Sequence, residues 1–561
     1  MADKRSNQRL SQKSASRGSS QEKSSVIRFI PIIILLFVSF SVYFNALSGG
    51  FVYDDQGQVV ENPWIRDIGN ISKIFSGNVW GFEVIRSNYY RPLMNIIYLV
   101  NYHLFGLKPW GFHLVNIIFH SGVSVLLFLV TGRLLADSIV PTRPPYFSPA
   151  FIAAMLFAAD PIHTEAVTWI SGLPDVSFAF FYLLSFYLYV KSEGRFSGNY
   201  LFSIISFALA ALAKEPALTL PIILLGYDYV FREERRTFLN YAKKYIPYLV
   251  VGGIYLALRI HALGAFAPQK RLSLNLYESV INAFPFFIRY LQKLIFPLNL
   301  TAVYVFRPVG SIIDLRVLLS IIGAVVFVAI AYMALKKNKA AFLGVLLIVV
   351  PLMPVLYIPV IGAEYAFAER YLYLPSAGYA ILLALFFLFA REKLPRANAL
   401  ITGVFITIAV LYAVGTVNRN RTWKNDFTLW SDTVRKSPDS ATAHNNLGAA
   451  YASEGMSDMA AAEYQAALRL DPNYAKAHFN LGAVYAFEGM PDMAIAEYEA
   501  AVRLKPDYAK AHFYLGSAYA SQGQWDRAIA EYQTALRLKP DFHEARRHLN
   551  DIVSRQHSRF E

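Results

Sequence analysis

Residues 475–508 read AKAHFNLGAVYAFEGMPDMAIAEYEAAVRLKPDY, and the stretches on either side, 441–474 and 509–542, follow the same pattern with a period of 34 residues. In each repeat the small residues Ala and Gly recur at fixed offsets, with Tyr between them and Pro near the end. Small residues let two antiparallel helices approach, aromatic residues fill the remaining gap, and Pro ends the second helix. Each repeat therefore predicts one helix pair.

The recurring positions match the tetratricopeptide pattern, which predicts an all-α solenoid over 441–542. We expect a linker and half-repeat over 418–440, and a polar capping helix over 543–561. The concave groove of such an array binds extended peptide or another protein, so the repeats are expected to recruit a protein acceptor, unless they serve only in assembly. The matched positions are Leu447-Gly448, Leu481-Gly482 and Leu515-Gly516; Tyr451, Tyr485 and Tyr519; Ala460, Ala494 and Ala528; Tyr464, Tyr498 and Tyr532; Ala467, Ala501 and Ala535; and Pro472, Pro506 and Pro540.

The composition of the whole chain is that of a membrane protein. Of 561 residues, 55% are hydrophobic and 16% charged, whereas roughly a quarter of the residues of a soluble protein are charged. The chain has no cysteine, which excludes disulfides, thiolate catalysis and zinc–thiolate sites.

The net charge of +14 raises the question of nucleic-acid binding, and the distribution of charge argues against it. The segment 1–28 is rich in Ser, Gln, Lys and Arg, and is predicted to be a disordered cytoplasmic tail. The three repeats carry twelve acidic and eight basic residues, so the solenoid is mildly acidic. We therefore attribute the basic charge to membrane topology and expect no nucleic-acid partner.

Residues 29–417 are predicted to form a polytopic membrane domain with a large outer loop over 48–112. A helix needs about 20 apolar residues to cross a bilayer. About eleven stretches qualify, although Lys214-Glu215-Pro216 splits one region into two short spans, and 279–297 is either a further span or an interfacial helix. The predicted spans are 29–47, 113–135, 149–167, 170–190, 200–214, 216–231, 245–263, 315–335, 340–358, 372–390 and 398–417.

Basic residues in the loops predict the orientation of these spans. With eleven spans and the basic tail inside, the Lys- and Arg-rich loops all fall on the cytoplasmic side, as the positive-inside rule requires. The first span lacks a small-residue cleavage site and is expected to stay as an anchor. This places the N-terminus in the cytoplasm, the chain in the inner (cytoplasmic) membrane, and the repeats on the outer, periplasmic side.

Most polar motifs of the membrane domain then fall on the outer face. Ionisable residues within or beside apolar spans are costly and are treated as functional by default, so several clusters on one face predict one polar cavity. These motifs also have structural alternatives: Asp54-Asp55 as a turn or cap, Arg370 as the partner of Glu369 or Glu364, Lys214-Glu215 as an interfacial ion pair that caps two short helices, and His163 as a hydrogen-bond partner of a buried backbone carbonyl. The motifs are Tyr53-Asp54-Asp55, Tyr90-Arg91-Pro92, His113-Leu114-Val115-Asn116, Asp160-Pro161-Ile162-His163-Thr164-Glu165, Ser171-Gly172-Leu173-Pro174-Asp175, Lys214-Glu215-Pro216 and Glu369-Arg370-Tyr371.

In this order, and followed by tetratricopeptide repeats, these motifs resemble the transmembrane and tetratricopeptide-repeat-containing O-mannosyltransferases of the GT-C glycosyltransferase superfamily. The resemblance runs from about residue 45 onward, and the short repeat array is typical of a bacterial relative. It implies a GT-C-type helical membrane domain and an inverting transfer of sugar, with mannose expected, from a polyprenyl-phosphate carrier to a hydroxyl of a protein acceptor. Asp160 stands where the family motif begins with His.

The expected reaction assigns roles to ten residues. The base that takes the acceptor proton is Asp54 or Asp55. The leaving phosphate needs cationic donors, for which Arg91, Lys214 and Arg370 are candidates, with Arg307 a further one. The sugar and acceptor need polar groups, and a metal site is left open because Asp54, Asp55, Glu165 and Asp175 offer oxygen ligands without a recognisable spacing. The sugar- and acceptor-binding candidates are His163, Glu165, Asp175 and Glu369.

Two other classes remain open from the sequence. One is a non-enzymatic membrane-anchored scaffold whose repeats gather partners for envelope assembly. The other is a transporter or flippase, which is expected to show repeated halves and mid-span ionisable residues. A substitution of Asp54 or Asp55 that abolishes sugar transfer while folding and assembly are retained would distinguish the enzyme from both alternatives.

Overall fold

The computed structural model describes residues 29–83, 87–135, 148–232, 238–265, 274–356 and 366–560. The predictions for the tail 1–28 and for parts of several loops lie outside these ranges. The chain divides into two compact units. The membrane unit holds residues up to Leu300 and Phe306–Asn425, and the repeat unit holds Thr301–Val305 and the residues from Asp426 onward.

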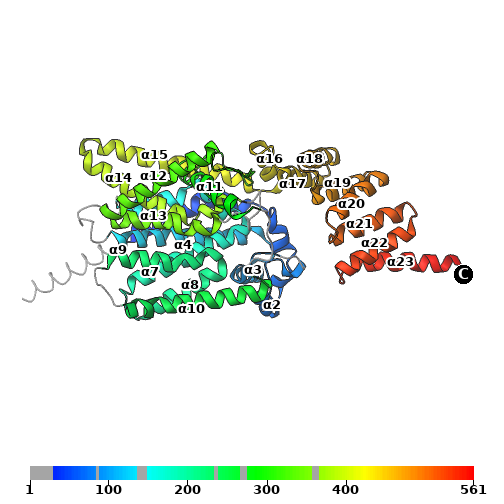
Figure 1. Cartoon of the computed structure of the whole chain (residues 1–561), viewed down its shortest axis with the longest axis horizontal. Helices are drawn as coiled ribbons and strands as arrows, with labels where there is room; N and C mark the ends of the chain where they lie inside the picture. The colour runs from blue at the N-terminus through cyan, green and yellow to red at the C-terminus, as the bar shows by residue number, and fades with distance from the viewer. Residues whose placement is uncertain are drawn as a thin grey trace, which may run out of the picture. The chain divides into compact units, whose positions relative to one another are not determined.

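The membrane unit is a bundle of apolar helices, and its long helices α4, α7, α8, α10 and α13 run roughly along one direction (Figure 1). Eight helices of the described residues are long and apolar enough to cross a membrane, so the chain is an integral membrane protein. A ninth span arises if a bent helix pair is counted as one. The eight are Phe29–Ser48, α4 (Pro109–Leu134), Ile170–Lys191 with α7 (Leu173–Lys191), Lys243–Leu263 within α10 (Phe238–Leu263), α12 (Leu315–Lys337), Lys339–Leu356 with α13 (Lys339–Leu352) and η10 (Met353–Leu356), α14 (Pro375–Lys393), and Pro395–Trp423 with α15 (Asn398–Asn420).

The prediction of eleven spans is therefore too high by two or three. The expected spans 200–214 and 216–231 correspond to α8 (Gly198–Ala213) and α9 (Leu220–Phe231), which have only 16 and 12 residues. Between them the chain adopts a 3-10 turn, η9 (Glu215–Thr219), in which Pro216 is the second residue. A Pro at this position favours the start of a new helix over the continuation of the old one. The region 279–297 forms α11 (Leu276–Ile295), which the length and apolarity criteria do not class as a span.

The bent pair consists of α5 (Pro149–Ala159) and the short helices η7 (Pro161–His163) and α6 (Thr164–Thr168), with an angle of 49° between the two parts. Asp160 explains the bend. Its backbone is extended, and its carboxylate accepts a hydrogen bond from the N–H of Ile162 at 3.0 Å, so that Pro161 starts a new helix. Asp160 is thus a capping residue here, where the resembled family has His.

The expected outer loop 48–112 is itself folded into short helices. Trp64, Trp80 and Tyr90 pack with the helices of the bundle in the apolar core, so this segment is part of the membrane unit and shapes one end of it. Its elements are η1 (Phe44–Ser48), η2 (Gln56–Val60), η3 (Pro63–Arg66), η4 (Ile68–Asn70), α2 (Ile71–Ser76), η5 (Gly81–Glu83) and α3 (Pro92–Phe105).

The repeat unit is a stack of helix pairs, as its sequence predicts (Figure 1). At Gly482 an added Cβ would lie 2.9 Å from the ring of Tyr498, and the equivalent glycines face equivalent tyrosines, which explains the Gly at this position. The repeats also share a His–Glu hydrogen bond that the sequence pattern alone did not reveal: His478 contacts Glu497 at 2.6 Å, and the same pair recurs at the same spacing of 19 residues in the other two repeats. The helices are α16 (Asp426–Lys436), α17 (Ala441–Ser453), α18 (Ser457–Leu470), α19 (Ala475–Phe487), α20 (Pro491–Leu504), α21 (Ala509–Ser521), α22 (Trp525–Leu538) and α23 (His543–Phe560).

Candidate functional site

The two predicted carboxylates, Asp54 and Asp55, lie in different surroundings although they are neighbours. Asp55 is fully buried, and Asp54 is half-buried. The backbone of Tyr53 has φ 54°, in the left-handed region that non-glycine residues seldom adopt. The chain then continues into a π-helical turn, η2. Both features are enriched at functional sites.

The carboxylate of Asp55 is occupied by three hydrogen-bond donors. Its Oδ1 accepts from the backbone N–H and the hydroxyl of Ser171, at 2.8 and 2.5 Å, and its Oδ2 accepts from the N–H of Val52 at 3.0 Å. Burial raises the pKa of Asp55 to about 7, and the charge of Asp54 adds to the rise, while the bonds from Ser171 and Val52 oppose it. The arrangement fastens the loop that carries Asp54 to the start of α7.

Gly172 allows this attachment. A Cβ at Gly172 would lie 2.4 Å from the backbone carbonyl oxygen of Ala166, so a side chain there would push η8 (Ile170–Gly172) away from α6. The carbonyl of Ile170 accepts from the hydroxyl of Tyr98 at 3.1 Å. The turn that presents Ser171 to Asp55 is thus fixed on both sides.

Trp169 joins the Asp54–Asp55 loop to the cationic part of the site. Its ring stacks on that of Tyr53, with centroids 5.9 Å apart, and the guanidinium of Arg370 lies over the Trp169 ring, 5.4 Å from its centroid. The indole Nε1 of Trp169 is buried and makes no hydrogen bond within the part of the chain that the structure describes. This donor is available to an oxygen atom of a ligand.

The predicted phosphate- and sugar-binding residues pair with one another. Arg370, on η12 (Glu369–Leu372), donates from its guanidinium and from its backbone N–H to Glu165. Lys214 forms an ion pair with Asp175 and lies over the ring of Tyr371. These pairs bring four of the predicted residues together, and Asp175, Lys214 and Arg370 line one small cavity of about 10 Å³.

Arg91 belongs to the same cluster, with a looser contact. It lies 3.8 Å from Glu215, and Arg259 contacts the other oxygen of that carboxylate at 2.7 Å. One carboxylate therefore faces two guanidinium groups. Burial lowers the pKa of Lys214 to about 8, and although Asp175 opposes this, the positive charges of Arg91 and Arg370 add to the decrease. Neighbouring positive charges of this kind favour the binding of an anion.

Two of the predicted sugar-binding residues have other partners. Glu369 is fully buried and pairs with Arg419 at 2.9 Å. His163 is fully buried and contacts the hydroxyl of Ser376 at 2.6 Å. Their predicted roles are not tested by these contacts, which place both side chains in the packed interior.

Arg259 and Arg419 are site-forming residues that the sequence reasoning missed. Both are arginines near the end of apolar spans, and the rule that intramembrane charges are functional by default would have found them. Trp169, taken from the sequence as a membrane-interface anchor, is instead 5% exposed and stacks on Trp423 as well as on Tyr53.

For a metal ion, the described part of the chain contains no group of three or more His, Asp or Glu side chains that could hold one. Asp55, Glu165 and Asp175, three of the four carboxylates considered from the sequence, are instead engaged with Ser171, Arg370 and Lys214.

The sequence of the chain is similar to those of several protein O-mannosyl-transferases. The chain is 29% identical to protein O-mannosyl-transferase F38B6.6 of Caenorhabditis elegans over 450 residues, which cover 78% of this chain and 62% of the relative. It is 26% identical to protein O-mannosyl-transferase TMTC3 of Mus musculus, over 77% of this chain and 50% of the relative, and 27% identical to TMTC4 of the same organism, over 75% and 64%.

The chain is a homologue of the protein O-mannosyl-transferases. This confirms the resemblance drawn from the motifs. The chain spans between 50% and 64% of the length of these relatives. Family models for the tetratricopeptide repeat match residues 453–489 and 479–543, which confirms the repeats of this mannosyltransferase homologue.

Among solved structures, the crystal structure of MamA matches 23% of this chain and 75% of its own, at 25% identity and a TM-score of 0.22. A likeness of this extent informs neither the fold of the membrane unit nor its function.

Proposed function

We propose that this protein transfers mannose from a polyprenyl-phosphate carrier to a hydroxyl group of a protein acceptor. The observation that carries the proposal is the stacking of Tyr53, the chain neighbour of the half-buried Asp54, on Trp169, whose ring also contacts the guanidinium of Arg370, within a homologue of the protein O-mannosyl-transferases. A glycosyl transfer of this kind needs a base for the acceptor and positive charge for the leaving phosphate, and the site offers both.

Asp54 is the base in this proposal, and Asp55 positions it. A general base must come within hydrogen-bond reach of the proton it removes, so geometry takes precedence over pKa. Both oxygens of Asp55 are already bonded to protein donors in a fully buried place. Asp54 is more exposed and is held by the same anchored loop.

The bond changes follow from this assignment. Asp54 removes the proton of the acceptor hydroxyl, and that oxygen forms a bond to the anomeric carbon of mannose. The bond from this carbon to the phosphate oxygen breaks, and polyprenyl phosphate leaves with the electron pair and an additional negative charge. Attack from the side opposite the phosphate inverts the anomeric centre.

Arg91, Lys214 and Arg370 stabilise the phosphate as its charge grows. The cavity beside Lys214 and Arg370 has room for about one water molecule, so the phosphate enters by displacing a carboxylate from one of the ion pairs. Arg91 has the longest of these contacts, and its Nε makes no hydrogen bond within the described residues. Glu165 and Asp175, once displaced, accept hydrogen bonds from sugar hydroxyls, while the buried His163 and Glu369 contact Ser376 and Arg419.

The repeats recruit the protein acceptor on the same side of the membrane as the site. With the bent pair of α5 and α6 counted as one span, there are nine spans, which like eleven place the two ends of the chain on opposite sides. A cytoplasmic N-terminus then puts the repeats on the outer, periplasmic face of the inner membrane. The positive-inside bias of the loops supports this orientation.

The experiment that tests the proposal uses the full chain in proteoliposomes with three radiolabelled donors: polyprenyl-phosphate mannose, polyprenyl-phosphate glucose and GDP-mannose. We expect label to reach protein from the first donor only. Label transferred from GDP-mannose but not from the lipid donors would contradict the proposal, and the absence of transfer from any donor by folded protein would favour the scaffold.

A further inference from the structure

Arg259, near the end of α10, is a buried arginine to which the proposed reaction gives no role. Its guanidinium has two partners: Nη1 donates to Oε1 of Glu215 at 2.7 Å, and Nη2 donates to the backbone carbonyl of Asn88 at 2.7 Å. Only 8% of its side chain is exposed. Because both terminal nitrogens are engaged within the protein, a contribution of Arg259 to the reaction has to act through these partners.

Both partners of Arg259 belong to segments that carry candidate phosphate-binding residues. Asn88 lies three residues before Arg91 in the chain, and Glu215 follows Lys214 directly. The two hydrogen bonds of Arg259 therefore tie the segment that ends in Arg91, just before α3, to the start of η9.

Glu215 faces two guanidinium groups at unequal distances. Its Oε1 accepts a charge-assisted hydrogen bond from Arg259, whereas its Oε2 lies 3.8 Å from Nη2 of Arg91, beyond hydrogen-bond range. Burial acts to raise the pKa of Glu215, but the charges of Arg91 and Arg259 outweigh this and hold the pKa below its ordinary value, so the carboxylate is ionised. Arg259 is thus the close partner of this carboxylate and Arg91 the loose one.

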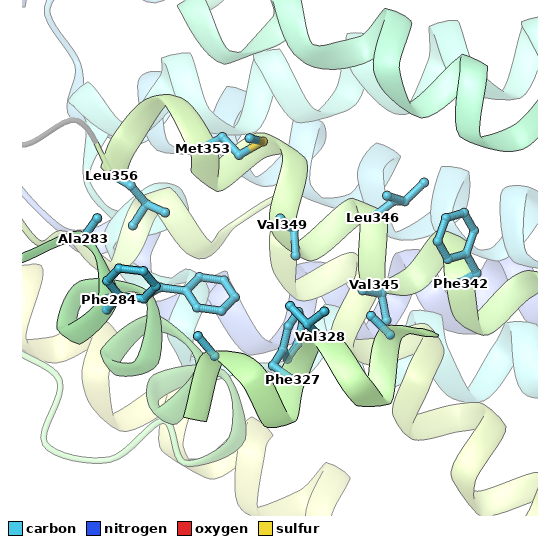
Figure 2. A pocket seen from close by; sticks show the side chains of 13 residues that line it. Ala283, Phe284, Phe327, Val328, Phe342, Val345, Leu346, Val349, Met353 and Leu356 are labelled. Atoms are coloured by element: carbon cyan, nitrogen blue, oxygen red, sulfur yellow. The ribbon is translucent and has the colours of Figure 1, made fainter. Parts of the chain in front are cut away.

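The other polar and apolar surroundings make Arg91 the most accessible cation for a phosphate. The groove among α11, α12 and α13 supplies no charge, because all 13 residues that line it are Ala, Val, Leu, Met or Phe (Figure 2). Lys214 and Arg370 are already in close ion pairs. The Nε of Arg91 makes no hydrogen bond within the part of the chain that the structure describes. A phosphate therefore meets the least competition at Arg91, as long as Glu215 stays with Arg259.

We infer that Arg259 is a positioning residue for the donor: it holds Glu215 away from Arg91 and so keeps Arg91 available to the phosphate of the lipid-linked sugar. The inference rests on the proposed function, and adds how this cation is kept available. Without Arg259, the carboxylate of Glu215 turns to the other guanidinium that it faces, closes the gap of 3.8 Å and competes with the phosphate.

The test is equilibrium binding of radiolabelled farnesyl phosphate to the full-length protein in detergent. Arg259→Gln should weaken this binding roughly tenfold, because Glu215 then occupies Arg91. Addition of Glu215→Gln to this variant should restore binding to within about twofold of the wild type, since the competing carboxylate is gone. Glu215→Gln alone should not weaken binding. Lys243→Gln is the matched control: Lys243 is an exposed cation near the opposite end of α10, and its loss should leave binding unchanged.

Three results would overturn the inference. They are the absence of binding by the wild type, unchanged binding by Arg259→Gln, and binding by the double variant that stays as weak as that of Arg259→Gln, which would show that Arg259 does not act through Glu215. If Arg259→Gln does not fold, the same weakening and the same restoration are required of Arg259→Lys, which has one nitrogen to share between Glu215 and the carbonyl of Asn88.

Kinetics distinguish positioning from a general loss of structure. With the lipid-linked donor, Arg259→Gln should raise the KM and leave kcat within about twofold, whereas partial unfolding would lower kcat and leave the KM unchanged. Binding needs no sugar transfer, so the two proposals fail separately. Variants that bind as expected in a protein that transfers no mannose would refute only the proposed function, and transfer by the wild type with equal binding by all variants would refute only the role of Arg259.

Discussion

Ser171 donates two hydrogen bonds to one carboxylate oxygen of Asp55, from its backbone N–H at 2.8 Å and from its hydroxyl at 2.5 Å. The two residues are 116 positions apart in the chain. The contact joins the loop after the first span to the start of α7. Asp55 is fully buried and anchors this loop, while Asp54 is the more exposed of the two carboxylates.

The stability of the membrane unit should depend on pH through Asp55. Burial raises the pKa of Asp55 from 3.8 to about 7 in the folded protein, so the folded state keeps a proton that the unfolded chain releases above about pH 4. This contribution to stability is fully present below pH 4 and is lost as the pH rises through 7. We expect the melting temperature in detergent to fall between pH 5 and 8 in the wild type and to fall less in Asp55→Asn. An identical slope in both proteins would contradict the assignment.

Arg91→Gln should weaken donor binding more than it slows the chemical step. A hydrogen bond from a charged group contributes about 1.5–3 kcal/mol, so the KM for the lipid-linked donor should rise roughly tenfold or more. Arg316→Gln is the matched control, because Arg316 pairs with Asp314 at a site 64% exposed on the arginine side. Initial-rate kinetics over a range of donor concentrations measure both constants. A fall in kcat with unchanged KM would place Arg91 elsewhere in the reaction.

Gly482→Ala should loosen the second repeat. The new methyl group would lie 2.9 Å from the ring of Tyr498, closer than packed carbon atoms come, and overpacking of this kind costs about 1–3 kcal/mol. Hydrogen exchange of the full-length protein should show faster exchange over α19 and α20. Ala486→Ser, at an exposed position of the same helix, is the control and should show no change; equal protection in both variants would contradict the close approach.

The third repeat should be more stable at mildly acidic pH. Burial acts to lower the pKa of His512, but its hydrogen bonds to Glu531 and to the carbonyl of Pro506 outweigh this and raise the pKa above 6.5. The resulting stability is fully present below pH 6.5 and is lost as the pH rises through the folded-state value. Hydrogen exchange over α21 and α22, corrected for the intrinsic effect of pH, should quicken at alkaline pH in the wild type. His512→Ala should lose this dependence; a variant that keeps it would contradict the role of His512.

The repeats and most of the long spans could be predicted from the sequence because their signals are local. The Gly and Tyr positions of each repeat are 16 residues apart or less, and apolar length is read within one helix. The count of spans was wrong where a local break decides it: Asp160 caps a new helix, and Pro216 lies in a turn between two short helices. Hydropathy alone does not show whether the chain crosses or turns back.

The sequence predicted residues of the candidate site, but it did not predict which of them form ion pairs with one another. Arg370 pairs with Glu165, 205 positions away, rather than with its neighbour Glu369. Glu369 instead meets Arg419, which no motif had singled out. Such pairs depend on how distant helices pack, and the nearest charge in the sequence is a poor guide because adjacent side chains on a short helix point apart. The charged residues of the site could be predicted because each is costly beside an apolar span.

The most direct test of the account compares mannose transfer by Asp54→Asn and Asp55→Asn in proteoliposomes that contain polyprenyl-phosphate mannose and an acceptor protein. Loss of a general base costs roughly 10²–10⁴-fold in rate, so Asp54→Asn should lose transfer to that extent while keeping the wild-type melting temperature. Asp55→Asn should lose less activity and show the altered pH dependence of stability. Undiminished transfer by Asp54→Asn would contradict the central claim, namely that Asp54 removes the acceptor proton from a loop that Asp55 holds in place.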